Sequence, residues 1–189
     1  MCTYLGISSH LSANDIDENS IVSHELIFLE GYLWDKGISE KMFKHAISVA
    51  KKNKVKIAMS LSDIFCVTRH KQDFYNLLKK DLDILIGNEN EILELTEAKN
   101  LLDSINILKE FNKLIVVTRS EKGSLAIHQN QVTECNGIKV EKILDLTGAG
   151  DLFAAGFLKE YIDSSDIKKC LQTGSILASK IIQKFGARL

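Results

Sequence analysis

Short apolar runs that alternate with helical patterns constrain the fold of this chain most strongly. Four such runs, at residues 26–29, 55–59, 82–86 and 114–117, predict buried strands. Between them, residues 40–53, 71–80 and 89–111 carry apolar side chains at helical spacing, the last in two pieces. Strands that alternate with helices form βαβ units, so we expect a parallel sheet whose strands are buried on both faces.

The pattern changes after Thr118. Residues 125–128 and 132–135 predict a hairpin, and residues 138–143 predict a further short strand that leads into a glycine loop. Two helices, at residues 150–162 and 166–185, are expected to close the fold. No linker or repeat interrupts the chain, so we expect a single α/β domain over residues 1–189 with a mostly parallel sheet.

Composition excludes several classes of function. The 189 residues contain 24 Lys and Arg against 25 Asp and Glu, a net charge of −1 that argues against a nucleic-acid-binding protein. No run approaches the roughly 18 apolar residues of a membrane span, and the first residues do not resemble a signal peptide. The four cysteines have neither zinc-site nor redox-motif spacing. We therefore expect a cytoplasmic protein with reduced thiols that binds a small molecule, not nucleic acid or a membrane.

Polar residues follow each predicted parallel strand. They lie at residues 30–32, 60–63, 88–91 and 118–120. Because ligands of open parallel sheets bind beyond the carboxyl ends of the strands, this edge is the expected site.

The segment of residues 145–151, with glycines at 148 and 150, precedes an apolar helix. Converging N–H groups and a helix N-terminus favour an anion such as phosphate. The segment lacks the Lys of a P-loop, and Phe153 occupies the third glycine position of a dinucleotide fingerprint. A tight turn without ligand remains the alternative interpretation.

Asp151 is unusual in such a loop, because its carboxylate would repel a phosphate. A kinase that phosphorylates a hydroxyl needs a base there, which takes the hydroxyl proton beside N–H groups that stabilise the transferring phosphoryl group. Alternatively, Asp151 only favours the first helical turn electrostatically.

Residues 145–151 resemble the D-T-x-G-A-G-D signature of the ribokinase-like (PfkB) carbohydrate kinase family. Residues 88–91 resemble its N-x-x-E motif, residues 116–123 its T-x-G-x-x-G nucleotide loop, and residues 185–188 its C-terminal G-A motif. The resemblance is closest to the adenosine-kinase-like branch. It implies a ribokinase-like three-layer αβα fold and transfer of the γ-phosphoryl group of ATP to a hydroxyl of a sugar or nucleoside.

The resemblance also implies roles for individual residues. Asp151 would be the base, and Gly148, Ala149 and Gly150 would supply the anion hole. Asn88 and Glu91 would hold Mg²⁺ through water. The nucleotide would be bordered by Asn88, Glu91, Thr118, Gly123, Asp145, Thr147 and Ser175. Read alone, Asn88 and Glu91 also form a capping box, and Glu30 and Asp63 could be ordinary polar residues at strand ends.

The chain departs from the family pattern at three places. Leu146 replaces a Thr of the signature, and Ser120 replaces a Gly of the nucleotide loop. Residues 1–6 resemble an internal strand, so we expect the N-terminal strands and lid of the family to be missing. Such a chain would expose a sheet edge and associate through it, for instance as a homo-oligomer. An inactive nucleotide-binding remnant is the alternative function; a dinucleotide-binding oxidoreductase is weaker, because the glycine fingerprint fails.

Overall fold

The computed structural model describes residues 6–35 and 39–189. The internal strand predicted at the start of the chain falls on residues 1–6, of which residues 1–5 lie outside the described part. The chain divides into two compact units, residues 1–107 and 108–189. A single domain over residues 1–189 stays a prediction.

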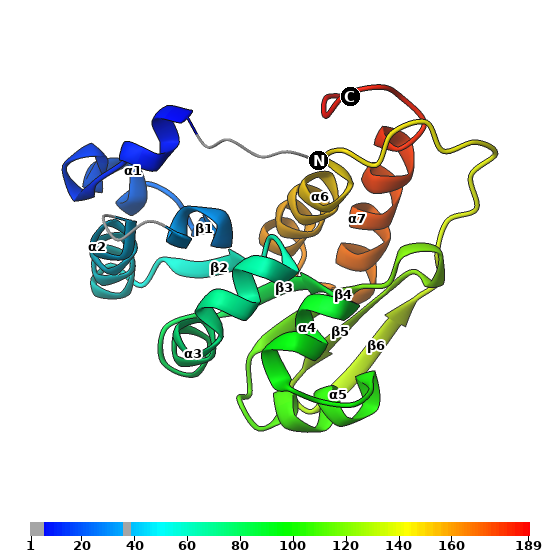
Figure 1. Ribbon diagram of the computed structural model, residues 1–189, viewed down its shortest axis with the longest axis horizontal. Coiled ribbons are helices and arrows are strands. Elements are labelled where there is room, and N and C mark those ends of the chain that lie inside the picture. The colour runs from blue at the N-terminus through cyan, green and yellow to red at the C-terminus, as the bar shows by residue number, and fades with distance from the viewer. Residues whose placement is uncertain (1–5, 36–38) are drawn as a thin grey trace. The chain divides into compact units, whose positions relative to one another are not determined.

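The first unit alternates strands and helices, as its sequence pattern predicts (Figure 1). Three 3₁₀ helices and a short α-helix belong to its first part: η1 (Gly6–His10), η2 (Ala13–Asp15), α1 (Glu18–Val22) and η3 (Gly31–Asp35). The regular elements are β1 (Leu26–Glu30), α2 (Ser39–Lys52), β2 (Lys56–Ser60), α3 (Ile64–Lys80), β3 (Ile84–Asn88), α4 (Glu89–Thr96) and α5 (Leu101–Lys109), which crosses into the second unit.

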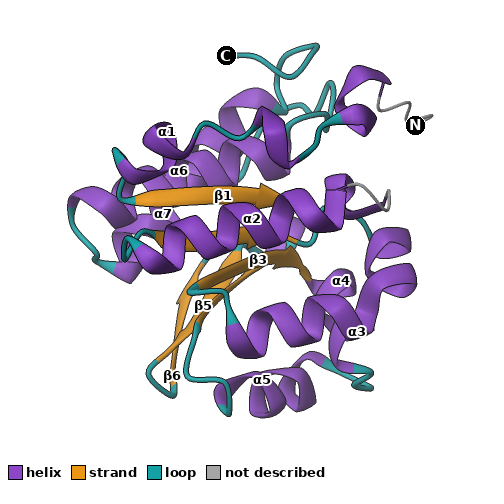
Figure 2. Ribbon diagram, turned by 90° about the vertical axis from the view of Figure 1, so that its left-hand side faces the viewer, coloured by secondary structure: helices purple, strands orange, loops and turns teal. Residues whose placement is uncertain are grey.

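The three strands of the first unit are parallel and lie in chain order. Leu26 pairs with Lys56 and Glu30 with Ser60, while Ser60 pairs with Ile86. Helix α2 contacts β2, and Figure 2 shows it lying lengthwise along this part of the sheet. The carboxyl ends of these strands therefore meet at one edge, which is the arrangement that the polar strand ends predict.

The core of the first unit is apolar and aromatic. Phe43 and Phe74 are almost completely buried, and the edge of the Trp34 ring packs against both, with centroids 5.2 and 6.2 Å away. The indole N–H of Trp34 donates to Asp73 at 3.2 Å, so the buried ring keeps its polar atom paired.

Strand β1 differs from the prediction that every strand is buried on both faces. Phe28 is 37% exposed, and no side chain of β1 is fully buried. Within the described residues, β1 has β2 as its one neighbouring strand. An apolar strand thus occupies an edge position. The sequence pattern could not predict this, because apolar composition does not tell how many neighbouring strands a strand has.

The second unit is built around an antiparallel sheet. Its strands are β4 (Leu114–Thr118), β5 (Ser124–His128) and β6 (Gln131–Cys135), with η4 (Ser120–Lys122) before β5. Gln129 and Asn130 join β5 to β6, and both have positive φ values, of 49° and 62°. Two consecutive left-handed residues suit the twist of a two-residue hairpin, so the predicted hairpin is confirmed.

Helices α6 (Ala149–Asp163) and α7 (Ile167–Ile181) pack closely on each other, and α7 packs on β5 and β6. Two glycines permit the close approach. A Cβ atom on Gly156 would lie 3.0 Å from the Thr173 carbonyl oxygen, and one on Gly174 would lie 2.8 Å from that of Phe153. Neither position has room for a larger residue.

The strand predicted at residues 138–143 is wrong. These residues form an irregular segment between β6 and α6, and Ile138 and Ile143 are 43% and 56% exposed. Among the described residues the segment pairs with no strand. Alternating apolar residues need a neighbouring strand to satisfy their backbone groups, and a local pattern does not supply one.

Two smaller findings concern membranes and thiols. Within the described ranges, no helix is long and apolar enough to cross a membrane. Cys66, Cys135 and Cys170 are buried and form no disulfide with one another, while Cys2 lies outside the described residues; reduced thiols stay a prediction.

Candidate active site

The strand ends of the first unit carry a compact set of polar groups. The Asp63 carboxylate caps α3 by accepting from the Phe65 N–H at 2.7 Å. Gly31 follows β1 so closely that a Cβ atom there would lie 2.8 Å from the Leu61 carbonyl oxygen. The loop after β1 and the loop after β2 therefore run against each other, which fixes their shape.

Asn88 and Glu91 form the capping box that the sequence offered as one interpretation. The Glu91 N–H donates to the Asn88 Oδ1 atom at 3.0 Å, and the Asn88 N–H donates to the Glu91 Oε2 atom at 2.9 Å. The side-chain amide of Asn88 also donates to the Glu91 Oε1 atom at 2.6 Å. Both carboxylate oxygens of Glu91 are thus oriented by one residue, and helix α4 begins at this point.

Glu91 is a buried carboxyl group with an altered pKa. Glu91 is 6% exposed, and this burial raises the pKa of its carboxyl group to about 7. The hydrogen bond from the Asn88 N–H opposes the increase, and the negative charge of Asp63 adds to it. A Cβ atom on Gly87 would lie 3.2 Å from the Glu91 Oε2 atom. The Leu61 Cδ1 atom would lie closer still, at 2.8 Å, so a side chain at position 87 would crowd both Leu61 and the carboxylate.

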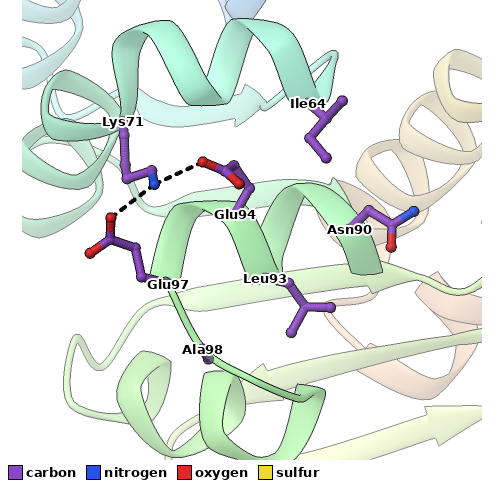
Figure 3. A pocket seen from close by; sticks show the side chains of 7 residues that line it. All are labelled: Ile64, Lys71, Asn90, Leu93, Glu94, Glu97 and Ala98. Atoms are coloured by element: carbon purple, nitrogen blue, oxygen red, sulfur yellow. Dashed lines mark hydrogen bonds and ion pairs between the residues drawn. The ribbon is translucent and has the colours of Figure 1, made fainter.

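A surface pocket of the first unit is lined by residues of α3 and α4, among them Ile64 and Asn90, the chain neighbours of Asp63 and Glu91 (Figure 3). Its volume is about 430 Å³, and Lys71 faces Glu94 and Glu97 in it, at 2.8 and 2.9 Å. None of the residues predicted for the site lines this pocket. Lys71 is paired with both carboxylates, and the charged side chains of the pocket carry a net charge of −1.

In the second unit, the glycine loop leads directly into α6. Gly148 has a φ of 81° and caps the helix without a side-chain hydrogen bond, so the first-turn N–H groups receive no capping side chain. Asp151 is exposed in this first turn, and a Cβ atom on Gly150 would meet no atom within 4 Å. The Ala149 N–H donates to the Leu146 carbonyl oxygen at 3.2 Å. A helix N-terminus without a capping side chain, beside an exposed carboxylate, is the combination that an anion site with a base requires.

The predicted nucleotide loop follows β4. Ser120 has a φ of 51° and therefore adopts the left-handed conformation, which strains a residue other than glycine. This conformation explains why the family pattern has a glycine at this position. Gly123, with a φ of 91°, lies against the Cys135 carbonyl, and its N–H and carbonyl groups bond Ser120 and Arg119. These two hydrogen bonds hold the loop together around Ser120.

Of the remaining residues of interest in the second unit, Ser175 is nearly buried, and Asp145, Leu146 and Thr147 belong to the glycine loop itself. Ser175, on α7, is 9% exposed. Leu146, which replaces a threonine, is 65% exposed. Thr147 donates its N–H and its hydroxyl to the Asp145 Oδ1 atom, at 2.9 and 2.6 Å.

Sequence reasoning missed Gly137, which has no room for a Cβ atom because the Glu121 carbonyl lies against it. No local signal marks this glycine, since its neighbour comes from the loop after β4. The effect of Asp63 on the pKa of Glu91 likewise has no local signal, because the two residues are far apart in the sequence.

Comparisons with known proteins agree with these motifs. The model of a family described as pfkB family carbohydrate kinase matches residues 1–189. A cytidine kinase of Thermococcus kodakarensis is 34% identical over 119 residues, which are 61% of this chain and 42% of that protein. A 5-dehydro-2-deoxygluconokinase of Bacillus subtilis is 27% identical over 183 residues, 93% of this chain and 56% of that protein.

Among solved structures, the adenosine kinase of Sinorhizobium meliloti superimposes with a TM-score of 0.93 at 31% identity, over 96% of this chain and 56% of that one. This similarity confirms the predicted ribokinase-like α/β fold. The chain spans about half the length of these relatives.

Proposed function

Because the chain belongs to the pfkB family of carbohydrate kinases, we propose that it transfers the γ-phosphoryl group of ATP to a hydroxyl group of a sugar or nucleoside, with an adenosine-like acceptor as one candidate. One observation carries the proposal: the exposed Asp151 lies in the first turn of α6, three residues after the Gly148 cap, at a helix N-terminus that receives no capping side chain. Similarity to nucleoside and sugar kinases supports the acceptor class.

In the proposed reaction, Asp151 takes the proton of the acceptor hydroxyl. The hydroxyl oxygen forms a bond to the γ-phosphorus, while the bond from that phosphorus to the bridging oxygen breaks and ADP leaves with the electron pair. The N–H groups of Gly148, Ala149 and Gly150 would form the anion hole for the charge on the transferring group. The Ala149 N–H donates to the Leu146 carbonyl oxygen at 3.2 Å and would have to turn from that bond to take part. Because helix α6 begins here, its dipole adds to that stabilisation.

We propose Asn88 and Glu91 as the residues that hold Mg²⁺ through water. The structure supports an indirect contact, because both oxygens of Glu91 are bonded to Asn88. Mg²⁺ keeps much of its water shell in phosphate complexes, and when bound it would neutralise phosphate charge.

The remaining predicted residues belong to the nucleotide side of the proposed site. Thr118 and Gly123 border the loop after β4, Asp145 and Thr147 belong to the loop that would face the phosphates, and Ser175 would approach the base. Their support is the motif match, together with the loop geometry around Gly123.

The decisive experiment replaces the proposed base. Asp151→Asn keeps the side-chain size and should lower turnover by roughly 10²–10⁴-fold. Asp163→Asn, at the other end of α6 where Asp163 pairs with Lys159, is the matched control and should keep turnover. ADP release would be measured with Mg-ATP and a panel of adenosine, cytidine, ribose and 5-dehydro-2-deoxygluconate.

Two outcomes would count against this assignment. A fully active Asp151→Asn variant would exclude Asp151 as the base. A wild-type chain that binds Mg-ATP but phosphorylates no acceptor would favour the second function, a nucleotide-binding remnant of a kinase.

We also propose that the chain associates through the β1 edge. Its support is the single described strand neighbour of β1 and the 37% exposure of Phe28. Phe28→Lys should shift the mass measured by light scattering at high protein concentration toward the monomer. An unchanged mass distribution would contradict this proposal.

A further inference from the structure

The segment that follows α7 lies on the segment that precedes α6. The Leu144 and Asp145 N–H groups donate to the Ile182 carbonyl oxygen at 2.8 and 3.3 Å. Farther along, a Cβ atom on Gly148 would lie 3.0 Å from the Ala187 Cβ atom. Figure 1 shows these two parts of the second unit, in yellow and red, beside each other. The glycine loop is thus packed against the C-terminal residues.

Asp145 joins the two segments with its side chain. One carboxylate oxygen, Oδ1, accepts the N–H and the hydroxyl of Thr147, at 2.9 and 2.6 Å. The other oxygen, Oδ2, accepts the Gly186 N–H at 2.9 Å, from 41 residues away in the chain. These hydrogen bonds hold the pKa of Asp145 below its ordinary value, so the bonds are charge-assisted at neutral pH.

The position of this clamp matters because the anion site begins three residues later. Gly148 must keep its left-handed φ of 81° for the chain to enter α6 at Ala149 without a capping side chain. Ala187 leaves no space for Gly148 to move toward it. Any loss of the Gly186 bond would release both the loop and the residues packed against it.

Resting on the phosphotransfer proposed above, we propose that Asp145 is a positioning residue. Its carboxylate clamps Gly186 and Ala187 onto the glycine loop and thereby sets the direction of the N–H groups that would bind the transferring phosphoryl group. The C-terminal residues then belong to the catalytic apparatus without contacting the substrate.

Three variants separate the bonds of the clamp. Asp145→Ala removes all three. Asp145→Asn keeps an acceptor for Thr147 but turns an amide group toward the Gly186 N–H. Thr147→Val removes the hydroxyl bond alone. The loop should therefore loosen most in Asp145→Ala, less in Asp145→Asn and least in Thr147→Val.

The matched control is Asp166→Ala. Asp166 caps α7 by accepting from the Lys169 N–H at 3.2 Å. Its loss weakens the same unit without touching the loop. Circular dichroism establishes that each full-length variant is folded, and Asp145→Asn and Thr147→Val carry the test if Asp145→Ala does not fold.

Hydrogen exchange followed by mass spectrometry gives a readout that needs no substrate. Peptides that cover residues 144–152 and 183–189 should both exchange faster in the Asp145 variants than in the wild type or in Asp166→Ala. In the kinase assay, Asp145→Asn should lower kcat about tenfold or more. This loss should be smaller than the roughly 10²–10³-fold loss that follows removal of a whole oxyanion-hole donor. The KM for the acceptor should stay nearly unchanged. A merely structural loss would reduce the active fraction in Asp166→Ala as well.

Each result either supports or refutes the role of Asp145 as a positioning residue. Unchanged exchange in both peptides would overturn the clamp, and faster exchange with an unchanged kcat would overturn its effect on catalysis. If the wild type phosphorylates no acceptor, the proposed function fails on its own. The affinity for inorganic phosphate, measured by calorimetry, then decides: weaker binding by Asp145→Asn supports positioning, and equal binding refutes it.

Discussion

The buried carboxyl group of Glu91 should make this chain less stable as the pH rises through neutrality. Burial raises the pKa of Glu91 from 4.5 to about 7 in the folded state. Between these two pKa values the folded chain holds a proton that the unfolded chain has released. The contribution of the protonated Glu91 to the unfolding free energy is therefore fully present below pH 4.5 and is lost as the pH rises through about 7. This difference in pKa corresponds to about 3 kcal/mol of unfolding free energy.

Glu91→Gln removes the titration while keeping the shape of the side chain. The variant has one side-chain acceptor oxygen instead of two, so it loses one of the two hydrogen bonds that Asn88 donates to Glu91, a cost of about 1 kcal/mol that does not depend on pH. Urea unfolding of both proteins from pH 5 to 8 measures the difference in unfolding free energy. The variant should gain about 2–3 kcal/mol relative to the wild type across this range, because most of the transition lies within it.

Glu94→Gln on the same helix is the control. The hydrogen bond from Lys71 lowers the pKa of Glu94, so the stabilisation from this pair is fully present above pH 4.5 and is lost only as the pH falls below it. Its difference from the wild type should stay flat between pH 5 and 8. Parallel stability curves of the wild type and Glu91→Gln would refute the reasoning about burial.

Three further predictions concern packing and burial. Gly174→Val should destabilise the chain by about 1–3 kcal/mol in urea unfolding, because its Cβ atom would meet the Phe153 carbonyl; an unchanged midpoint would contradict this. Ser124→Ala should be neutral or stabilise by up to about 1 kcal/mol, since the buried hydroxyl has no partner among the described residues; a large loss of stability would show that it has one. Burial raises the pKa of Cys170 to about 11, so iodoacetamide should label it far more slowly in the folded chain than in urea, as mass spectrometry would measure.

Much of the architecture is predictable because it depends on near neighbours in the chain. The apolar run that forms β4 and the helical spacing of α2 mark their elements within a residue or two. The capping box of Asn88 and Glu91 spans three residues, so its pattern is visible in the sequence and recurs in the structure. The glycine loop before α6 is found in the same way.

The errors come from features that depend on neighbours far along the chain. The apolar pattern of residues 138–143 predicts a strand, but a strand also needs a partner, and no described strand pairs with it. The apolar run of β1 predicts burial on both faces, but its edge position leaves Phe28 partly exposed. Helix α3 begins at Ile64, earlier than predicted, because Asp63 caps it.

Short motifs in the sequence are enough to identify the family, most of the strands and helices in their order, and the types of residue available for the proposed phosphoryl transfer. Tertiary structure alone decided the pKa of Glu91 and the joining of Asp145 to Gly186 across 41 residues. Burial and long-range hydrogen bonds exist only once distant segments are packed together, so no local pattern encodes them directly.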